Sequence, residues 1–212
     1  MKKIREKYGL VNLIICLLCI IILVINSIFI SKNSLYEISD NLITAYCLNF
    51  LAGCQGVLGK WGSMSYETFF VKGQWWRCIT HIYLHVGVIH MVMNISALLI
   101  AGKYVEKRYG SLYYLIIFHM TAIVDSIITC MIFSSESVGA SAGIFGVIGI
   151  LIILFLKKQI SLKKAEIVYL IIFFVLSLIL GIESLIIHMI ALALGMIIGL
   201  WQTRHEKADC CQ

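Results

Sequence analysis

The stretch VGASAGIFGVIGI, residues 138–150, places a single serine, Ser141, among glycines at the head of a long apolar run. Small residues spaced four apart, such as Gly139 and Gly143, let two membrane helices approach closely. A serine in this position is therefore either packing material between helices or, with a base beside it, a nucleophile. The rest of the chain must distinguish these interpretations.

The composition is that of a membrane protein. Of the 212 residues, 61% are hydrophobic and 13% are charged, and the chain has no proline. A soluble domain is about half apolar and about a quarter charged. The net charge of +6 does not indicate a nucleic-acid partner, because membrane proteins collect Lys and Arg in their cytoplasmic segments. The partner expected from composition is the lipid bilayer.

Six apolar stretches are candidates for membrane-spanning helices. They cover residues 10–30, 86–102, 112–133, 140–156, 165–180 and 185–201. The first follows a basic segment and has no small-residue cleavage site, so we expect a retained anchor rather than a signal peptide. The last three have only 16 or 17 residues, so local thinning of the bilayer is expected.

The distribution of basic residues orients these six spans. With the amino terminus inside, only Lys32, Lys60, Lys72 and Arg77 lie outside, and the other 13 of the 17 Lys and Arg lie in the cytoplasm. Counting residues 42–59 as a seventh span weakens this asymmetry, which the positive-inside rule disfavours. We therefore expect residues 42–59 to form a helix in the outer interface.

Polar side chains from three spans fall near the same, outer face of the membrane. His90 and Asn94, spaced i and i+4, project from one side of the second span. Ser141 begins the fourth span and His188 lies near the outer end of the sixth. Because polar groups are costly in a bilayer, this shared depth points to function. On the sixth span, the stripe of His188, Ala191, Gly195 and Gly199 predicts close packing against the glycine-rich fourth span.

A histidine beside Ser141 can remove its proton and allow attack on an acyl carbon. Asn94, His90 and the backbone N–H of Ser141 can then stabilise the oxyanion. The alternatives to catalysis are structural: a serine that only packs between helices, and histidines that only form hydrogen bonds between helices. Metal binding by His81, His85 and His90 is a weaker alternative, because no cysteine or carboxylate follows at ligand spacing.

At this point the sequence resembles the rhomboid family of intramembrane serine proteases, from about Lys72 to Gly199. The resemblance rests on four motifs in order: GQWWRCITHIYLHVGVIHMVMN at residues 73–94, YVEKRYG at 104–110, GASAGIFG at 139–146 and HMIALALG at 188–195. It implies an all-α membrane protein, a bundle of six transmembrane helices with an interfacial outer loop between the first two. It also implies a cytoplasmic segment at residues 1–9, one rhomboid-type domain at 10–201 and a cytoplasmic tail at 202–212.

The resemblance also assigns roles. It implies that Ser141 is the nucleophile, that His188 is the general base and that His90 and Asn94 line the oxyanion hole. Phe145 matches an aromatic residue that packs against the histidine. The pair Trp76 and Arg77 matches a structural element of the outer loop. The chain departs from the family pattern at Ala142 and Ala191, where glycine is usual.

The expected function is hydrolysis of peptide bonds within or beside transmembrane segments of membrane protein substrates, with no cofactor and no metal. The alternative is a rhomboid-like pseudoprotease that binds membrane helices without cleaving them. A transporter is disfavoured, because the polar cluster lies near one surface and no internal repeat is present. The expected location is a bacterial cell membrane, with both termini cytoplasmic and the active site open to the outside. The sequence assigns no role to His119 or Asp125 and no oligomeric state.

Overall fold

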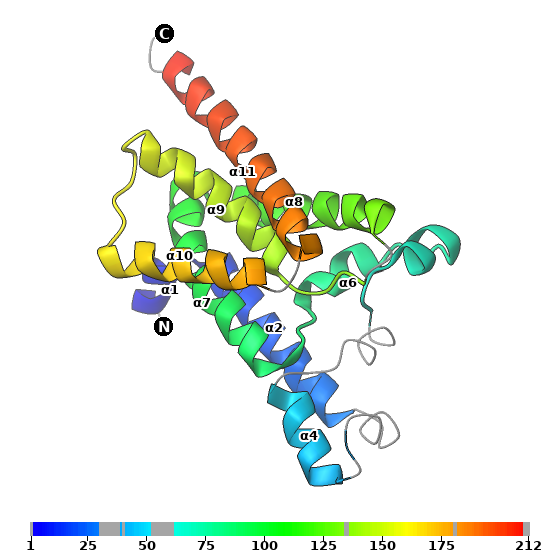
Figure 1. Ribbon diagram of the computed structural model, residues 1–212. Helices are drawn as coiled ribbons and strands as arrows, with labels where there is room; N and C mark the ends of the chain where they lie inside the picture. Colours follow the sequence, from blue (N-terminus) through cyan, green and yellow to red (C-terminus); the bar gives the residue numbers. More distant parts are fainter. Residues whose placement is uncertain are drawn as a thin grey trace. The chain divides into compact units, whose positions relative to one another are not determined.

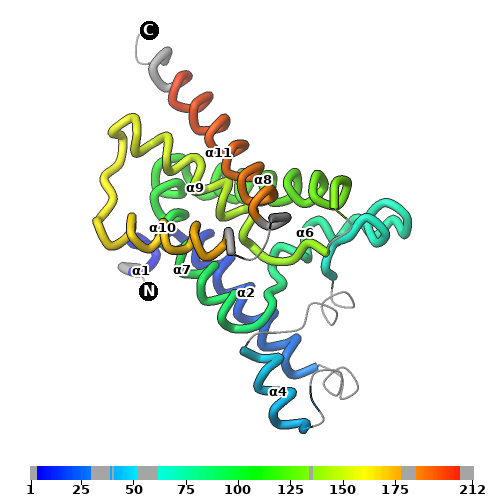
Figure 2. The backbone as a smooth tube through the Cα atoms, in the orientation of Figure 1, coloured from blue at the N-terminus to red at the C-terminus, as the bar shows by residue number. Residues whose placement is uncertain are grey.

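The computed structural model describes residues 2–29, 39, 41–51, 62–133, 136–179 and 182–209 (Figure 2). The chain divides into two compact units. The first unit comprises Met1–Leu13, Ala97–Asp125 and Ser141–Gln212, and the second comprises Ile14–Ser96 and Ser126–Ala140.

Helices make up nearly all of the described secondary structure (Figure 1). The described residues contain no strand, only an isolated antiparallel bridge between Met64 and Ser137. The helices are α1 (Lys2–Tyr8), α2 (Leu10–Ile28), α4 (Leu42–Leu51), the π-helix η1 (Glu67–Val71), α6 (Arg77–Tyr83), α7 (Gly87–Tyr109), α8 (Ser111–Ile132), α9 (Ser141–Leu156), α10 (Lys164–Ile179) and α11 (Ile182–Asp209). The all-α prediction is confirmed for this part of the chain.

Four described helices are long and apolar enough to cross a membrane: α2, α7, α8 and the Leu185–His205 part of α11. Helices α9 and α10 have 16 residues each, fewer than the roughly 20 that cross a 30 Å hydrocarbon core. The ten residues of α4 rise only about 15 Å. The remainder of the predicted interfacial helix, residues 52–59, lies outside the described residues.

Two helices extend well beyond the apolar stretches that predicted them. Helix α7 continues from the apolar stretch at 86–102 to Tyr109, and α11 continues from 185–201 to Asp209. Both extensions carry charged residues with good helix propensity, because backbone hydrogen bonding does not depend on an apolar side chain. Gly110 then ends α7: it adopts φ +87° and donates its N–H to the Glu106 carbonyl oxygen at 2.8 Å, a left-handed helix stop.

In the first unit, α9 and α11 cross with their backbones almost in contact (Figure 1). A Cβ atom on Gly195 would collide with the backbone of Gly146, and one on Gly149 would collide with the carbonyl oxygen of Leu192. A Cβ on Gly199 would lie 3.2 Å from the Ile150 Cα. The close packing predicted from the small-residue stripe on α11 is therefore present.

A second set of contacts in the first unit joins α2, α7 and α8 by polar groups. The Glu106 carboxylate accepts hydrogen bonds from the backbone N–H groups of Val11 and Asn12, at 3.0 and 2.8 Å, and from the Ser111 hydroxyl at 2.6 Å. Asn12, fully buried, donates to the Leu98 carbonyl oxygen and accepts from a tyrosine hydroxyl on α8. These bonds satisfy the start of α2.

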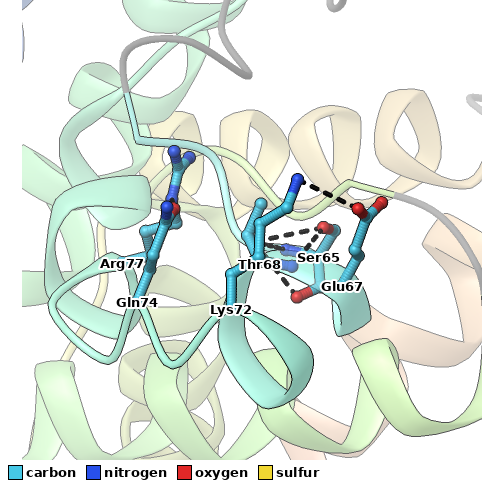
Figure 3. A network of polar contacts seen from close by, with 6 residues as sticks. All are labelled: Ser65, Glu67, Thr68, Lys72, Gln74 and Arg77. Carbon is cyan, nitrogen blue, oxygen red and sulfur yellow. Dashed lines mark hydrogen bonds and ion pairs between the residues drawn. The ribbon is translucent and has the colours of Figure 1, made fainter.

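In the second unit, the segment before α7 is ordered by its own hydrogen bonds (Figure 3). Ser65 and Thr68 bond each other at the start of η1, and Lys72 pairs with Glu67 at 2.9 Å. Because this ion pair is exposed, its contribution to stability is small. The turn at residues 73–76 then leads into α6.

Candidate active site

Ser141 is the first residue of α9 and is partly exposed. The first N–H groups of a helix have no partner within the helix, so this position offers donors to an incoming negative charge. Two residues earlier, Gly139 adopts φ +109°. A Cβ atom there would lie 3.0 Å from Cε1 of His90, so glycine meets both a backbone and a space requirement.

His188 lies on α11 and is 5% exposed. Its ring stacks on Phe145 of α9, with centroids 4.3 Å apart and planes inclined by 15°. Phe145 also stacks on Phe173 of α10 at 5.4 Å. The imidazole is thus held against α9 at the residue one helical turn after Ser141.

Asn94 and His90 belong to α7, in the second unit. Asn94 is 1% exposed, and among the described residues neither its amide oxygen nor its amide nitrogen has a hydrogen-bond partner. A buried unpaired amide costs free energy unless water or a ligand satisfies it. His90 is half-buried and its ring lies edge-on to that of His85, with centroids 5.2 Å apart.

Arg77 is buried at the start of α6, next to the exposed Trp76. Its Nη1 donates to the Ser63 carbonyl oxygen at 2.6 Å. Its Nε donates to Oε1 of Gln74, also at 2.6 Å (Figure 3). The rings of Trp75 and Trp76 meet edge to face at 6.1 Å. Arg77 therefore ties together two parts of the loop before α7.

The predicted residues fall into two sets. Ser141, Phe145 and His188 belong to the first unit, where Phe145 and His188 are in contact. The other predicted residues, Trp76, Arg77, His90 and Asn94, belong to the second unit. The catalytic roles of Ser141 and His188 and the oxyanion roles of His90 and Asn94 stay predictions.

A polar cluster that the sequence reasoning missed lies in the second unit. His81 Nδ1 donates to the Arg77 carbonyl oxygen at 2.7 Å, and its Nε2 accepts from the Ser126 hydroxyl, also at 2.7 Å. Ser126 in turn bonds the Ser137 hydroxyl at 3.0 Å. The sequence signal for this cluster is the i, i+4 spacing of His81 and His85, which is also compatible with metal binding. Since both nitrogens of His81 are engaged, it has no lone pair for a metal.

Burial keeps two histidines outside the spans neutral. Desolvation lowers the pKa of His81 to about 4. Desolvation, together with the neighbouring His90, lowers the pKa of His85 to about 3. Within the described residues, no three potential ligands among His, Cys, Asp and Glu gather into a metal-binding group.

The structure places Asp125 next to Ala191, a neighbour that the sequence did not indicate. It is fully buried on α8, and its carboxyl lies beside the backbone N–H of Ala191 on α11. Ala191 is one turn beyond His188 on the same helix. The buried acid of α8 therefore lies next to α11 within the first unit.

These features define a helical membrane protein that carries a serine and a histidine on two tightly packed helices. A model of the Rhomboid domain matches residues 72–204, more than half of the chain. The protein belongs to the rhomboid family, and the resemblance inferred from its motifs is confirmed.

Several proteins are similar to parts of this chain. Rhomboid protease GluP of Bacillus subtilis (strain 168) is 37% identical over 93 residues, 44% of this chain and 18% of that protein. RHOMBOID-like protein 6, mitochondrial, of Arabidopsis thaliana is 32% identical over 101 residues, 47% of this chain and 33% of that protein. Inactive RHOMBOID-like protein 8 of the same plant is 28% identical over 89 residues, 42% of this chain and 25% of that protein. The matched segments therefore cover a third or less of these relatives.

Proposed function

We propose that this rhomboid protein is an intramembrane serine endopeptidase that uses Ser141 and His188. The observation that carries the proposal is the ring stack between Phe145 and His188. It holds an imidazole against α9 at the residue one helical turn after the serine, which supports the pairing of base and nucleophile. The glycine contacts between α9 and α11 support the same arrangement.

The proposed chemistry proceeds in two steps. His188 takes the hydroxyl proton as Ser141 attacks the peptide carbonyl, and the protonated imidazole then gives this proton to the leaving amine. The result is an acyl-enzyme and a free amino terminus. Water, deprotonated by His188, next attacks the ester, releases the carboxylate product and restores the serine.

Donors for the oxyanion are proposed from Asn94, His90 and the backbone N–H of Ser141. The Asn94 amide is buried without a partner among the described residues, and such a group is suited to bind a charge that develops only during reaction. Loss of one oxyanion donor typically slows catalysis about 100-fold to 1,000-fold.

The membrane setting is also proposed. Six spans, with α9 and α10 as the short ones, place the amino and carboxyl termini in the cytoplasm of a bacterial cell and open the site to the outside. The substrates are transmembrane proteins. Segments with weak helix formers near the outer surface are favoured, because an extended backbone must be presented to Ser141.

The second candidate is a rhomboid-like pseudoprotease that binds membrane helices without cutting them. It deserves a test because one similar Arabidopsis protein has the word inactive in its name. The presence of both Ser141 and His188 in this chain favours the enzyme.

The decisive experiment compares the purified protein with the Ser141→Ala and His188→Ala variants. Wild type is expected to cleave a model single-span substrate and to be labelled by a serine-directed fluorophosphonate, and both variants are expected to do neither. A matched control is Ser177→Ala, which removes a buried hydroxyl bonded only within α10. Cleavage that survives in both dyad variants would eliminate the proposed dyad.

A further inference from the structure

The cluster of His81, Ser126 and Ser137 forms a directed chain of hydrogen bonds. His81 Nδ1 faces a carbonyl oxygen, so this nitrogen carries the proton and Nε2 is the acceptor. The Ser126 hydroxyl therefore donates to Nε2, and its oxygen accepts from the Ser137 hydroxyl. Hydrogen bonds aligned in this way polarise one another.

Although Ser126 and His81 have the contact expected of a serine–histidine dyad, burial excludes them as a second one. Ser126 is 0% exposed and His81 is 1% exposed. No peptide bond can reach an enclosed hydroxyl without unfolding the helices around it. The chain of hydrogen bonds must therefore act through the residues held at its Ser137 end.

The Ser137 end of this hydrogen-bond chain holds the backbone that leads into Ser141. Ser137 exchanges two backbone hydrogen bonds with Met64, at 2.7 and 3.0 Å. Gly139 donates its N–H to the carbonyl oxygen of His81 at 2.9 Å. His81 thus contacts this segment twice, directly through its backbone and indirectly through Ser126. The segment reaches Ser141 only two residues later.

We propose that His81, Ser126 and Ser137 are positioning residues for Ser141: their hydrogen bonds fix the backbone of residues 137–139, and this backbone sets where the serine acts. The proposal rests on the proposed function of Ser141. Residues that act through backbone placement change the chemical step and leave substrate binding alone.

Two single variants, Ser126→Ala and Ser137→Ala, test the proposal. Since a buried hydrogen bond contributes about 1 kcal/mol, each variant is expected to lower kcat about fivefold to tenfold with KM unchanged. The matched control is Ser27→Ala, which also removes a buried hydroxyl of the second unit but one that bonds within its own helix. Rates are expressed per fluorophosphonate-labelled molecule, so unfolded protein does not contribute.

A double variant and a conservative variant distinguish a positioning role from a general loss of stability. The double variant is expected to be no slower than the slower single variant, because both substitutions break the same chain. Ser137→Thr, which keeps the hydroxyl, is expected to restore kcat. An unchanged kcat in both single variants, or a double variant whose loss is the product of the two, overturns the proposal.

A second measurement remains informative if the protein has no protease activity. Hydrogen exchange at the Gly139 amide is expected to quicken about fivefold to tenfold in both variants and to stay unchanged in Ser27→Ala. Wild-type protein that neither cleaves nor labels defeats the proposed function alone. Equal exchange at Gly139 in wild type and variants defeats the positioning proposal alone.

Discussion

Phe145 touches both the proposed base and α10, so at the scale of single residues it is the most informative side chain. Replacement by leucine keeps an apolar group but removes the ring that stacks on His188. Because such aromatic pairs contribute about 0.5–1.5 kcal/mol, kcat is expected to fall about threefold to tenfold, measured on a model substrate. Phe155→Leu, at an exposed site on the same helix, is the control. Equal kcat values in wild type and Phe145→Leu would contradict a positioning role for the ring.

His81 gives a prediction for the pH dependence of stability. Its pKa is about 4 in the folded protein and about 6.5 when unfolded, so the unfolded chain takes up the proton first as the pH falls. The stabilisation is complete above about pH 6.5 and is lost as the pH falls towards 4, by up to about 3 kcal/mol. His85 acts in the same direction down to about pH 3.

Thermal unfolding in detergent between about pH 7 and pH 4.5 checks this behaviour. The melting temperature of wild type is expected to fall with pH more steeply than that of His81→Gln, because glutamine binds no proton. Parallel curves for wild type and His81→Gln would show that His81 is not buried as a neutral group.

The sequence predicts individual site residues more readily than their partners. Ser141 and His188 are predicted from one motif and one helical spacing, and Phe145 is predicted from the family resemblance. The partners of Asp125 and His81 depend on contacts between segments far apart in the chain, and periodicity carries no information about them. Ser126 belongs to no sequence pattern that would single it out, since it is one of several hydroxyl side chains on α8, which also carries Thr121 and Thr129.

At the scale of elements, the crossing of α9 and α11 depends on glycine. Gly195→Ala would push a methyl group into the backbone of Gly146, where no side chain can move aside. Overpacking of this kind typically costs about 1–3 kcal/mol, so a lower melting temperature and a loss of cleavage are expected. Ala193→Val, on an exposed face of α11, is the control. Wild-type stability in Gly195→Ala would mean that the helices do not cross at this point.

The Glu106 carboxylate offers a second test at this scale. It accepts two backbone N–H bonds at the start of α2 and one from Ser111. Glu106→Ala leaves these donors without their acceptor, which costs about 1–3 kcal/mol for each one that stays buried. A marked fall in the melting temperature of Glu106→Ala is expected. The control is Glu6→Ala, at an exposed position, for which no change is expected. A melting temperature equal to wild type would show that water replaces the carboxylate without cost.

Hydropathy predicts the long helices and most of their bounds: the stretches at 112–133, 140–156 and 165–180 lie within one residue of α8, α9 and α10. It misses the carboxyl-terminal ends of α7 and α11. Hydropathy falls after residue 102 in α7 and after residue 201 in α11, but the charged residues that follow still have good helix propensity, so both helices continue. Gly110, a residue with a conformational reason to stop a helix, marks the end of α7.

At the scale of the whole molecule, the sequence predicts the family and the all-helical class, and it leaves the arrangement of the two units undefined. The proposed six-span orientation has a direct test. Single cysteines, introduced in a background without the natural ones at Lys72 and at Gln159, should label differently in intact cells. A membrane-impermeant maleimide is expected to react at residue 72 and to reach residue 159 only after lysis.

The physical reason is the asymmetry of basic residues, since moving Lys and Arg to the outer side opposes insertion. Reversed labelling at the two positions would invert the orientation and close the site to the outside. Labelling at both positions in intact cells would remove at least one span from between them. The predicted pattern, by contrast, puts Ser141 on the external side, where water is available for hydrolysis.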